Sequence, residues 1–236
     1  MPPTDPPDRQ AQWRCPYPDC AGFSLLIEQN AQPGAEPICG ICRRPFTPRS
    51  AVHFEEMQKK VKLNPAPGAL APAAASDLVV VIEDLRSLHN VGAVFRTADG
   101  AGFSSILLCG ITGLPPRKEI AKVSLGAEEF VPWQFRPFIA GCLKELKEAN
   151  YCLVALEKND ISLPLYESLV QGKLRRPLAL VVGNEVSGVS REAQYYCDHI
   201  CHLSMRGRKE SLNVSVAFGA AAYLVSEYFS SCDSTY

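Results

Sequence analysis

The chain has no strong net charge and no obvious targeting or membrane segment. Its 24 Lys and Arg residues against 25 Asp and Glu residues give a net charge of -1. This excludes a broadly cationic nucleic-acid-binding coat, so any RNA contact must come from local basic clusters. The opening residues, MPPTDPPDRQ, hold no apolar stretch or cleavage-site pattern, and no run approaches the length of a membrane span. We therefore expect a cytoplasmic protein whose cysteines are mostly reduced.

Two common nucleotide-binding signatures are also missing. No G-x-G-x-x-G follows the first strand-like run, and no G-x-x-x-x-G-K-S/T occurs anywhere. These motifs supply the backbone cradle for a pyrophosphate or a nucleoside triphosphate. A nucleotide-dependent oxidoreductase is therefore disfavoured, although the chain alternates between strand-like and helix-like patterns.

The composition predicts two modules joined by a linker. Residues 1–52 carry paired cysteines, 53–76 read as a short helix and an Ala/Pro-rich linker, and 77–236 alternate as α/β. With 236 residues, 47% of them hydrophobic, the chain can bury a full core. We expect a mainly parallel sheet with helices on both faces. The predicted strands are 78–82, 105–109, 152–156, 178–182 and 200–203, and the predicted helices follow Asn90, Phe135, Gly188 and Leu212.

The N-terminal cysteines form two pairs that are typical of a zinc ribbon. Cys15 and Cys20 bracket CPYPDC, and Cys39 and Cys42 bracket CGIC. Two such pairs on opposed turns supply four thiolates for a tetrahedral, structural Zn²⁺. A segment of this size has too little core to be stable without such a metal. The first pair is wider than usual, so a metal-free cysteine cluster or a redox pair is the alternative.

Three apolar runs of the larger module each end in a polar turn and lead into a helical pattern. The segments are HNVGAVFRTADGAGF (89–103), VVGNEVSGVS (181–190) and LSMRGRKESLNVSVA (203–217). Parallel strands place such turns at one edge of the sheet, where α/β proteins bind ligands. Together, and in this order, the three segments resemble the signature motifs of the SpoU, or TrmH-type, RNA ribose 2′-O-methyltransferases. The resemblance covers the chain from about residue 77 onward.

The resemblance implies a specific fold, cofactor and assembly. Members have an α/β domain whose C-terminal segment makes a trefoil knot, and they bind S-adenosylmethionine in the knotted loops as homodimers. The implied substrate is a ribose 2′-OH in tRNA or ribosomal RNA. Carried over by position, the cofactor-binding residues are Gly183, Asn184, Met205, Ser211, Leu212 and Asn213. The implied catalytic residues are Asn90, Arg96, Glu185, Ser211 and Asn213.

The implied roles leave alternatives open. The family's proposed base matches Arg96, but a guanidinium holds its proton strongly, so we favour a role in gripping phosphate and stabilising alkoxide charge. In a purely structural interpretation, Asn90 and Asn213 are helix N-caps and Glu185 is an ordinary turn residue. Arg96 would then pair with Asp99. The main functional alternative is a catalytically silent knotted dimer that binds RNA through the ribbon and basic loops.

Overall fold

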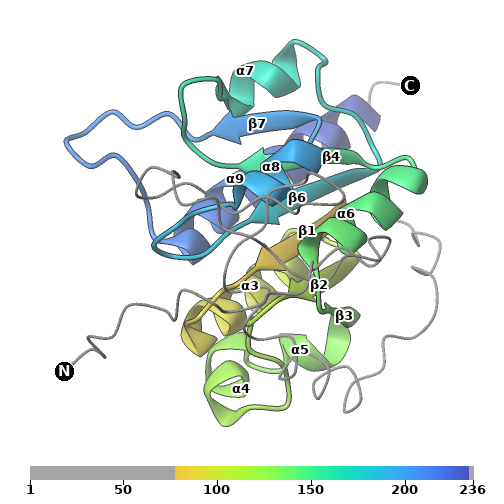
Figure 1. Ribbon diagram of the computed structural model, residues 1–236, viewed down its shortest axis with the longest axis vertical. Coiled ribbons are helices and arrows are strands. Elements are labelled where there is room, and N and C mark those ends of the chain that lie inside the picture. Colours follow the sequence, from red (N-terminus) through yellow and green to blue (C-terminus); the bar gives the residue numbers. More distant parts are fainter. Residues whose placement is uncertain (1–77, 234–236) are drawn as a thin grey trace, which may run out of the picture.

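The structure is a computed structural model that describes residues 78–233. The predicted N-terminal module and linker lie outside the described residues, and so do the four cysteines that we expect to bind zinc. Figure 1 shows the described part as a twisted central sheet with helices against it. No helix between residues 78 and 233 is long and apolar enough to cross a membrane.

The sheet has seven parallel strands in the order β3-β2-β1-β6-β4-β7-β5. The strand that comes sixth in the chain, β6, therefore lies between β1 and β4 at the centre. The strands are β1 (Leu78–Glu83), β2 (Ser105–Cys109), β3 (Trp133–Arg136), β4 (Cys152–Leu156), β5 (Leu163–Pro164), β6 (Leu178–Val182) and β7 (His199–His202).

The central strands are apolar except for Glu83 at the end of β1, because both faces of the sheet are covered. All six residues of β1 and all five of β6 are buried. Successive side chains of a strand point to opposite faces. Val80 and Ile82 accordingly join one core cluster, whereas Val79 and Val81 join the other.

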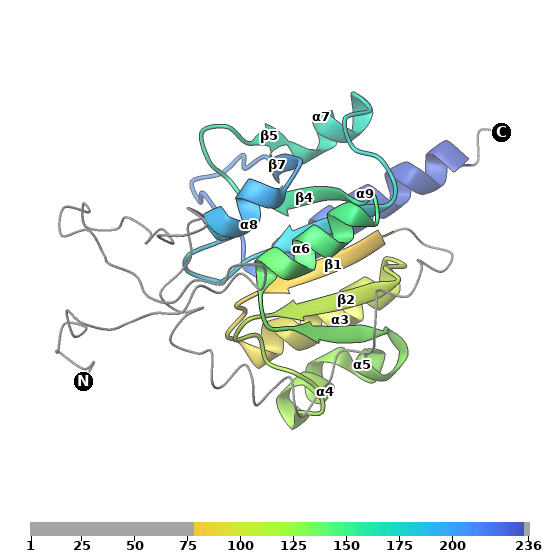
Figure 2. The same cartoon turned by 45° about the vertical axis from the view of Figure 1, so that its right-hand side comes forward.

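Helices cover both faces of the sheet, as the sequence predicts (Figure 2). One core contains apolar residues of α3 and α9, and the other contains those of α6 and α8. The helices are α3 (Leu88–Gly100), α4 (Lys118–Ser124), α5 (Ala127–Phe130), α6 (Ile139–Glu148), α7 (Leu165–Val170), α8 (Arg191–Tyr196) and α9 (Val214–Asp233). The trefoil knot stays a prediction of the resemblance.

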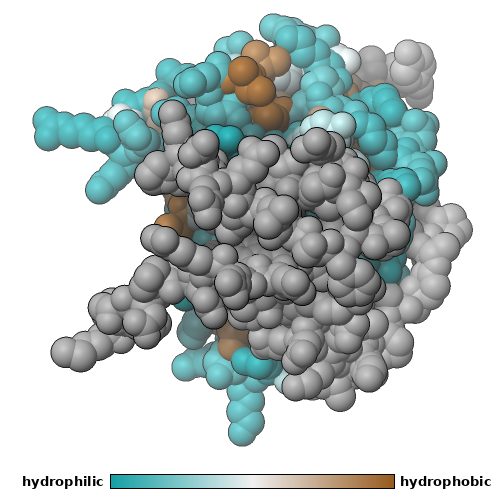
Figure 3. All heavy atoms as spheres, in the orientation of Figure 1, coloured by the Kyte–Doolittle hydropathy of each residue, from teal (hydrophilic) through white to brown (hydrophobic). Residues whose placement is uncertain are grey.

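The five predicted strands are all present, and β7 begins one residue earlier than expected. Strands β3 and β5 were not predicted from the sequence. The first is WQFR, which mixes polar and aromatic residues, and the second is only two residues long. Each lies at one edge of the sheet. An edge strand has one neighbouring strand instead of two, so its residues can be less apolar than those of a central strand. On the face seen in Figure 3, the described surface is mainly hydrophilic and its hydrophobic residues form small patches.

Candidate active site

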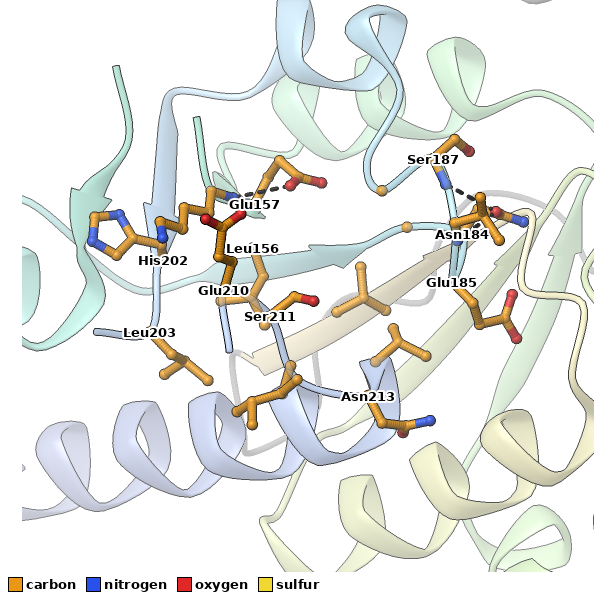
Figure 4. A pocket seen from close by; sticks show the side chains of 18 of the residues that line it. Leu156, Glu157, Asn184, Glu185, Ser187, His202, Leu203, Glu210, Ser211 and Asn213 are labelled. Atoms are coloured by element: carbon orange, nitrogen blue, oxygen red, sulfur yellow. Dashed lines mark hydrogen bonds between the residues drawn. The ribbon is translucent and has the colours of Figure 1, made fainter. Parts of the chain in front are cut away.

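A pocket of about 360 Å³ lies at the carboxyl edge of the sheet (Figure 4). It is lined by the loops that follow β4, β6 and β7, together with the first turn of α9. Its size is at the lower end of the range for small-molecule and cofactor sites. The predicted cofactor residues Gly183, Asn184, Met205, Ser211, Leu212 and Asn213 all line it, and so does Glu185.

The loop after β6 is held in a tight conformation that depends on Gly183. A Cβ on Gly183 would lie 2.1 Å from the carbonyl oxygen of Gly188. Asn184 and Gly188 exchange backbone hydrogen bonds of 3.0 and 2.9 Å across the loop. The side chain of Asn184 donates to the carbonyl of Asp84 (2.7 Å) and accepts from the backbone N–H of Val186 (2.9 Å). Asn184 thus fixes the loop to the end of β1.

Glu185 connects this loop to the start of α3. Its carboxylate accepts the backbone N–H groups of Arg86 (3.1 Å) and Ser87 (2.8 Å) and the side-chain amide of Asn90 (3.1 Å). Partial burial by itself raises the pKa of Glu185, but these hydrogen bonds outweigh it and hold the pKa below its ordinary value. Glu185 is therefore not an ordinary turn residue.

Stability should depend on pH through Glu185. Because the folded state lowers its pKa, the carboxylate stabilises the fold above about pH 4.5, its unfolded value, and loses that contribution as pH falls through the lower folded value. We expect Glu185→Gln to lower the Tm at pH 7, and this difference from wild type to shrink as pH falls below about 4.5. Thermal unfolding at a series of pH values measures it. Glu148→Gln, at an exposed position on α6, is the control. A difference that stays constant down to acid pH would contradict the prediction.

Asn213 connects the third turn to the first. Its side-chain oxygen accepts from the backbone N–H groups of Ser215 (2.9 Å) and Val216 (3.4 Å), so it caps α9 as the structural interpretation expects. Its amide also donates to the side-chain oxygen of Asn90 (3.2 Å). Asn90 therefore lies between Glu185 and Asn213. It is not an N-cap, because Ser87 caps α3 instead and accepts from the N–H of Asn90.

Two glutamates that the sequence analysis missed hold the end of the β6 loop from either side. Glu157, directly after β4, accepts the backbone N–H of Val189 (2.7 Å) and that of Lys158 (3.0 Å). Glu83, the last residue of β1, accepts the N–H (2.9 Å) and the hydroxyl (2.6 Å) of Ser190. Each glutamate ends or follows an apolar strand, and that position is the signal that could have identified it.

Arg96 is the one predicted catalytic residue that the structure does not bring into this arrangement. It is exposed on α3, and among residues 78–233 it neither lines the pocket nor makes a hydrogen bond or ion pair. The alternative pairing with Asp99 is absent from the described part of the chain. Within that part, no group of three or more His, Cys, Asp or Glu side chains is arranged to hold a metal ion.

Comparison with known proteins places these motifs in one family. Residues 77–223 match the SpoU rRNA Methylase family. The chain is 32% identical over 146 residues to the 23S rRNA (guanosine-2'-O-)-methyltransferase RlmB of Bordetella pertussis, covering 62% of this chain and 58% of that protein. It is 30% identical over 160 residues to RlmB of Xanthomonas axonopodis pv. citri, covering 68% of this chain and 62% of that protein. The chain thus spans less than two thirds of the length of these curated relatives.

Solved structures show the same fold. The A. aeolicus protein described as a TrmH/SpoU tRNA modifying enzyme is 25% identical, with a TM-score of 0.60 over 77% of this chain and 86% of that one. An AdoMet-bound rRNA methyltransferase from Sinorhizobium meliloti is 24% identical, with a TM-score of 0.61 over 67% of this chain and 59% of that one. The family match extends over all three motif turns, so the chain belongs to the SpoU rRNA methylase family.

Proposed function

We propose that the protein transfers a methyl group from S-adenosylmethionine to a ribose 2′-OH of ribosomal or transfer RNA. The observation that carries this proposal is the chain of hydrogen bonds from Glu185 through Asn90 to Asn213. These hydrogen bonds connect the three motif turns of this SpoU family chain to one another beside the pocket. RNA is the substrate class of the relatives named above.

The pocket residues fit the cofactor. Gly183 lines the pocket and has no side chain, so a ligand can lie against its main chain. Gly183, Asn184, Met205 and the segment from Ser211 to Asn213 would hold it. When bound, S-adenosylmethionine supplies an electrophilic sulfonium methyl group. Methyl transfer then depends on alignment and on removal of the proton of the 2′-OH.

The polar residues beside the pocket would act on the acceptor. Asn90, held on both sides by Glu185 and Asn213, presents a fixed amide, and Ser211 lies in the pocket wall. Arg96 is exposed on α3. A guanidinium group carries five N–H donors and no acceptor, which favours binding phosphate and stabilising a developing alkoxide over abstracting the proton.

Titration of S-adenosylmethionine and S-adenosylhomocysteine into the purified full chain tests the first half of the proposal. Labelled methyl transfer to total tRNA and rRNA, with nuclease digestion to locate 2′-O-methyl nucleotides, tests the second half. Micromolar cofactor binding with methylated ribose supports the enzyme. A folded protein that binds RNA but no cofactor would instead support the catalytically silent alternative.

We also propose that the protein works as a homodimer that packs through α9. Val216 (56% exposed), Ala220 and Tyr223 (49% exposed) form an apolar stripe along this helix. Gly100 of α3 lies against Tyr223, since a Cβ there would lie 2.8 Å from the tyrosine hydroxyl. Arg96 is one turn before Gly100 on the same face of α3. A partner on this stripe would therefore lie beside Arg96, which is outside the pocket of its own chain.

Tyr223→Asp should convert the dimer into a monomer, because the change puts a charge into the apolar stripe. Sedimentation or light scattering at a fixed protein concentration measures the mass. Tyr166→Asp is the matched control, since this tyrosine is 61% exposed on α7. A Tyr223→Asp protein that keeps the mass of a dimer would exclude this interface.

The zinc ribbon remains a proposal for residues outside the described part of the chain. It rests on the spacing of Cys15, Cys20, Cys39 and Cys42. We expect about one zinc ion per chain by elemental analysis, and its loss on replacing Cys39 and Cys42 with serine. Cys232→Ser, at an exposed position near the end of α9, is the control. Equal zinc content in all three proteins would exclude the ribbon.

A further inference from the structure

Glu157 is a pocket residue that none of the motifs accounts for. It follows β4 directly, and its carboxylate lies against the β6 loop. A Cβ on Gly188, whose φ is +68°, would lie 2.0 Å from a carboxylate oxygen of Glu157. The glycine therefore permits the carboxylate to approach the loop backbone. Such a contact places a charged group in the pocket wall at a fixed point.

The hydrogen bonds of Glu157 leave it able to accept more. One oxygen accepts from the N–H of Val189 and the other from that of Lys158, and these are its hydrogen bonds within the described residues. A carboxylate offers about four lone-pair sites, so each oxygen keeps one of its two. Two backbone donors fix the orientation of the group before any ligand arrives, which reduces the entropy cost of binding.

The other two carboxylates of the pocket differ from Glu157 in this respect. Glu185 already accepts from three donors and connects to α3, on the side of Asn90. Glu210 is exposed and makes no hydrogen bond or ion pair within residues 78–233. Figure 4 shows Glu157 and Glu185 on opposite sides of the pocket. A ligand that extends between them would meet an anchored acceptor at one end and the hydrogen-bonded side chains of Glu185, Asn90 and Asn213 at the other.

We infer that Glu157 is a specificity-determining residue that accepts hydrogen bonds from the ribose hydroxyls of the bound adenosyl group. This inference rests on the proposed function, since it assumes that the pocket takes an adenosyl cofactor. A pair of adjacent hydroxyls offers two donors side by side, and a carboxylate with one acceptor site left on each oxygen is complementary to them. An acidic side chain after a strand recognises a ribose in the same way in dinucleotide-binding folds.

The test compares two ligands in calorimetric titrations of the full chain. The ligands are S-adenosylhomocysteine and its analogue lacking both ribose hydroxyls. Hydrogen bonds to a charged acceptor change affinity by roughly tenfold or more, so the wild type should bind the analogue at least about tenfold more weakly. The quantity compared is the Kd of the analogue divided by the Kd of S-adenosylhomocysteine. Glu157→Ala should reduce this ratio to about two or less, and Glu157→Gln should give a ratio between that value and the wild-type ratio. Glu148→Gln, at an exposed position on α6 away from the pocket lining, should keep the ratio of the wild type.

The ratio separates ligand recognition from a merely structural role. If Glu157 only braces the β6 loop, its variants weaken both ligands equally and the ratio stays at the wild-type value, which overturns the inference. A wild-type ratio near one overturns it as well, whatever the variants do. Absence of any S-adenosylhomocysteine binding to the folded wild type would instead overturn the proposed function, and this inference with it.

Discussion

Arg96→Ala is expected to lower the rate of methyl transfer by about a thousandfold, the loss typical of removing a group that stabilises developing negative charge. The Kd for S-adenosylmethionine should stay within about twofold of wild type, because Arg96 does not line the pocket among the described residues. Single-turnover kinetics and calorimetry measure the two quantities. Arg117→Ala, at an exposed position next to α4, is the control for losing a surface charge.

Arg96→Lys distinguishes the two roles considered for this residue. If Arg96 grips phosphate, lysine keeps the charge but loses the planar fork, so the rate falls partially and its pH dependence is unchanged. If Arg96 removes the proton, lysine titrates at lower pH, with an unperturbed pKa of about 10.4, and the pH–rate profile shifts. An Arg96→Ala protein that loses cofactor affinity and rate equally would contradict both roles.

Gly183→Ala should destabilise the fold by roughly 3 kcal/mol and abolish measurable cofactor binding, because the new methyl group overlaps atoms that cannot rotate away. The added Cβ would lie 2.1 Å from the oxygen and 2.2 Å from the carbon of the Gly188 carbonyl, and 2.3 Å from the nitrogen of Val189. All three belong to the backbone, so the loop itself must move. Denaturant unfolding and calorimetric titration measure the two effects.

Gly207→Ala provides the matched control for this substitution. Gly207 lies in the loop between β7 and α9, and a Cβ there would meet nothing within 4 Å. We expect its stability and cofactor affinity to equal those of the wild type. A Gly183→Ala protein that behaves like Gly207→Ala would show that the β6 loop adjusts without cost, and it would remove the argument for a rigid cofactor loop.

The strands could be predicted because burial on both faces leaves a local signal. The runs at 78–82 and 178–182 are continuously apolar, and both became central strands. The position of β6 between β1 and β4 leaves no such signal, because strand order depends on pairings between distant segments. The motif turns could be located for the same local reason, since each follows an apolar run.

The connections within the site could be predicted less well. Glu83 bonds to a backbone N–H that is 107 residues away, and Glu157 bonds to one 32 residues away, so neither partner is visible locally. The N-cap of α3 shows the same limit at short range. Ser87 and Asn90 are both good capping residues, and the structure uses the serine for the cap and the asparagine for the long-range network.

The late position of β6 in the chain has a consequence for biosynthesis. Because the chain is synthesised from its N-terminus, β1 and β4 leave the ribosome before β6, the strand that lies between them in the sheet. Until residues 178–182 follow, both strands present unpaired edges that favour association with other chains. Truncation before β6 should therefore yield insoluble protein rather than a smaller stable domain. The chain can bind a ligand in the pocket only after the start of α9 has been synthesised, because residues of the first turn of that helix line the pocket.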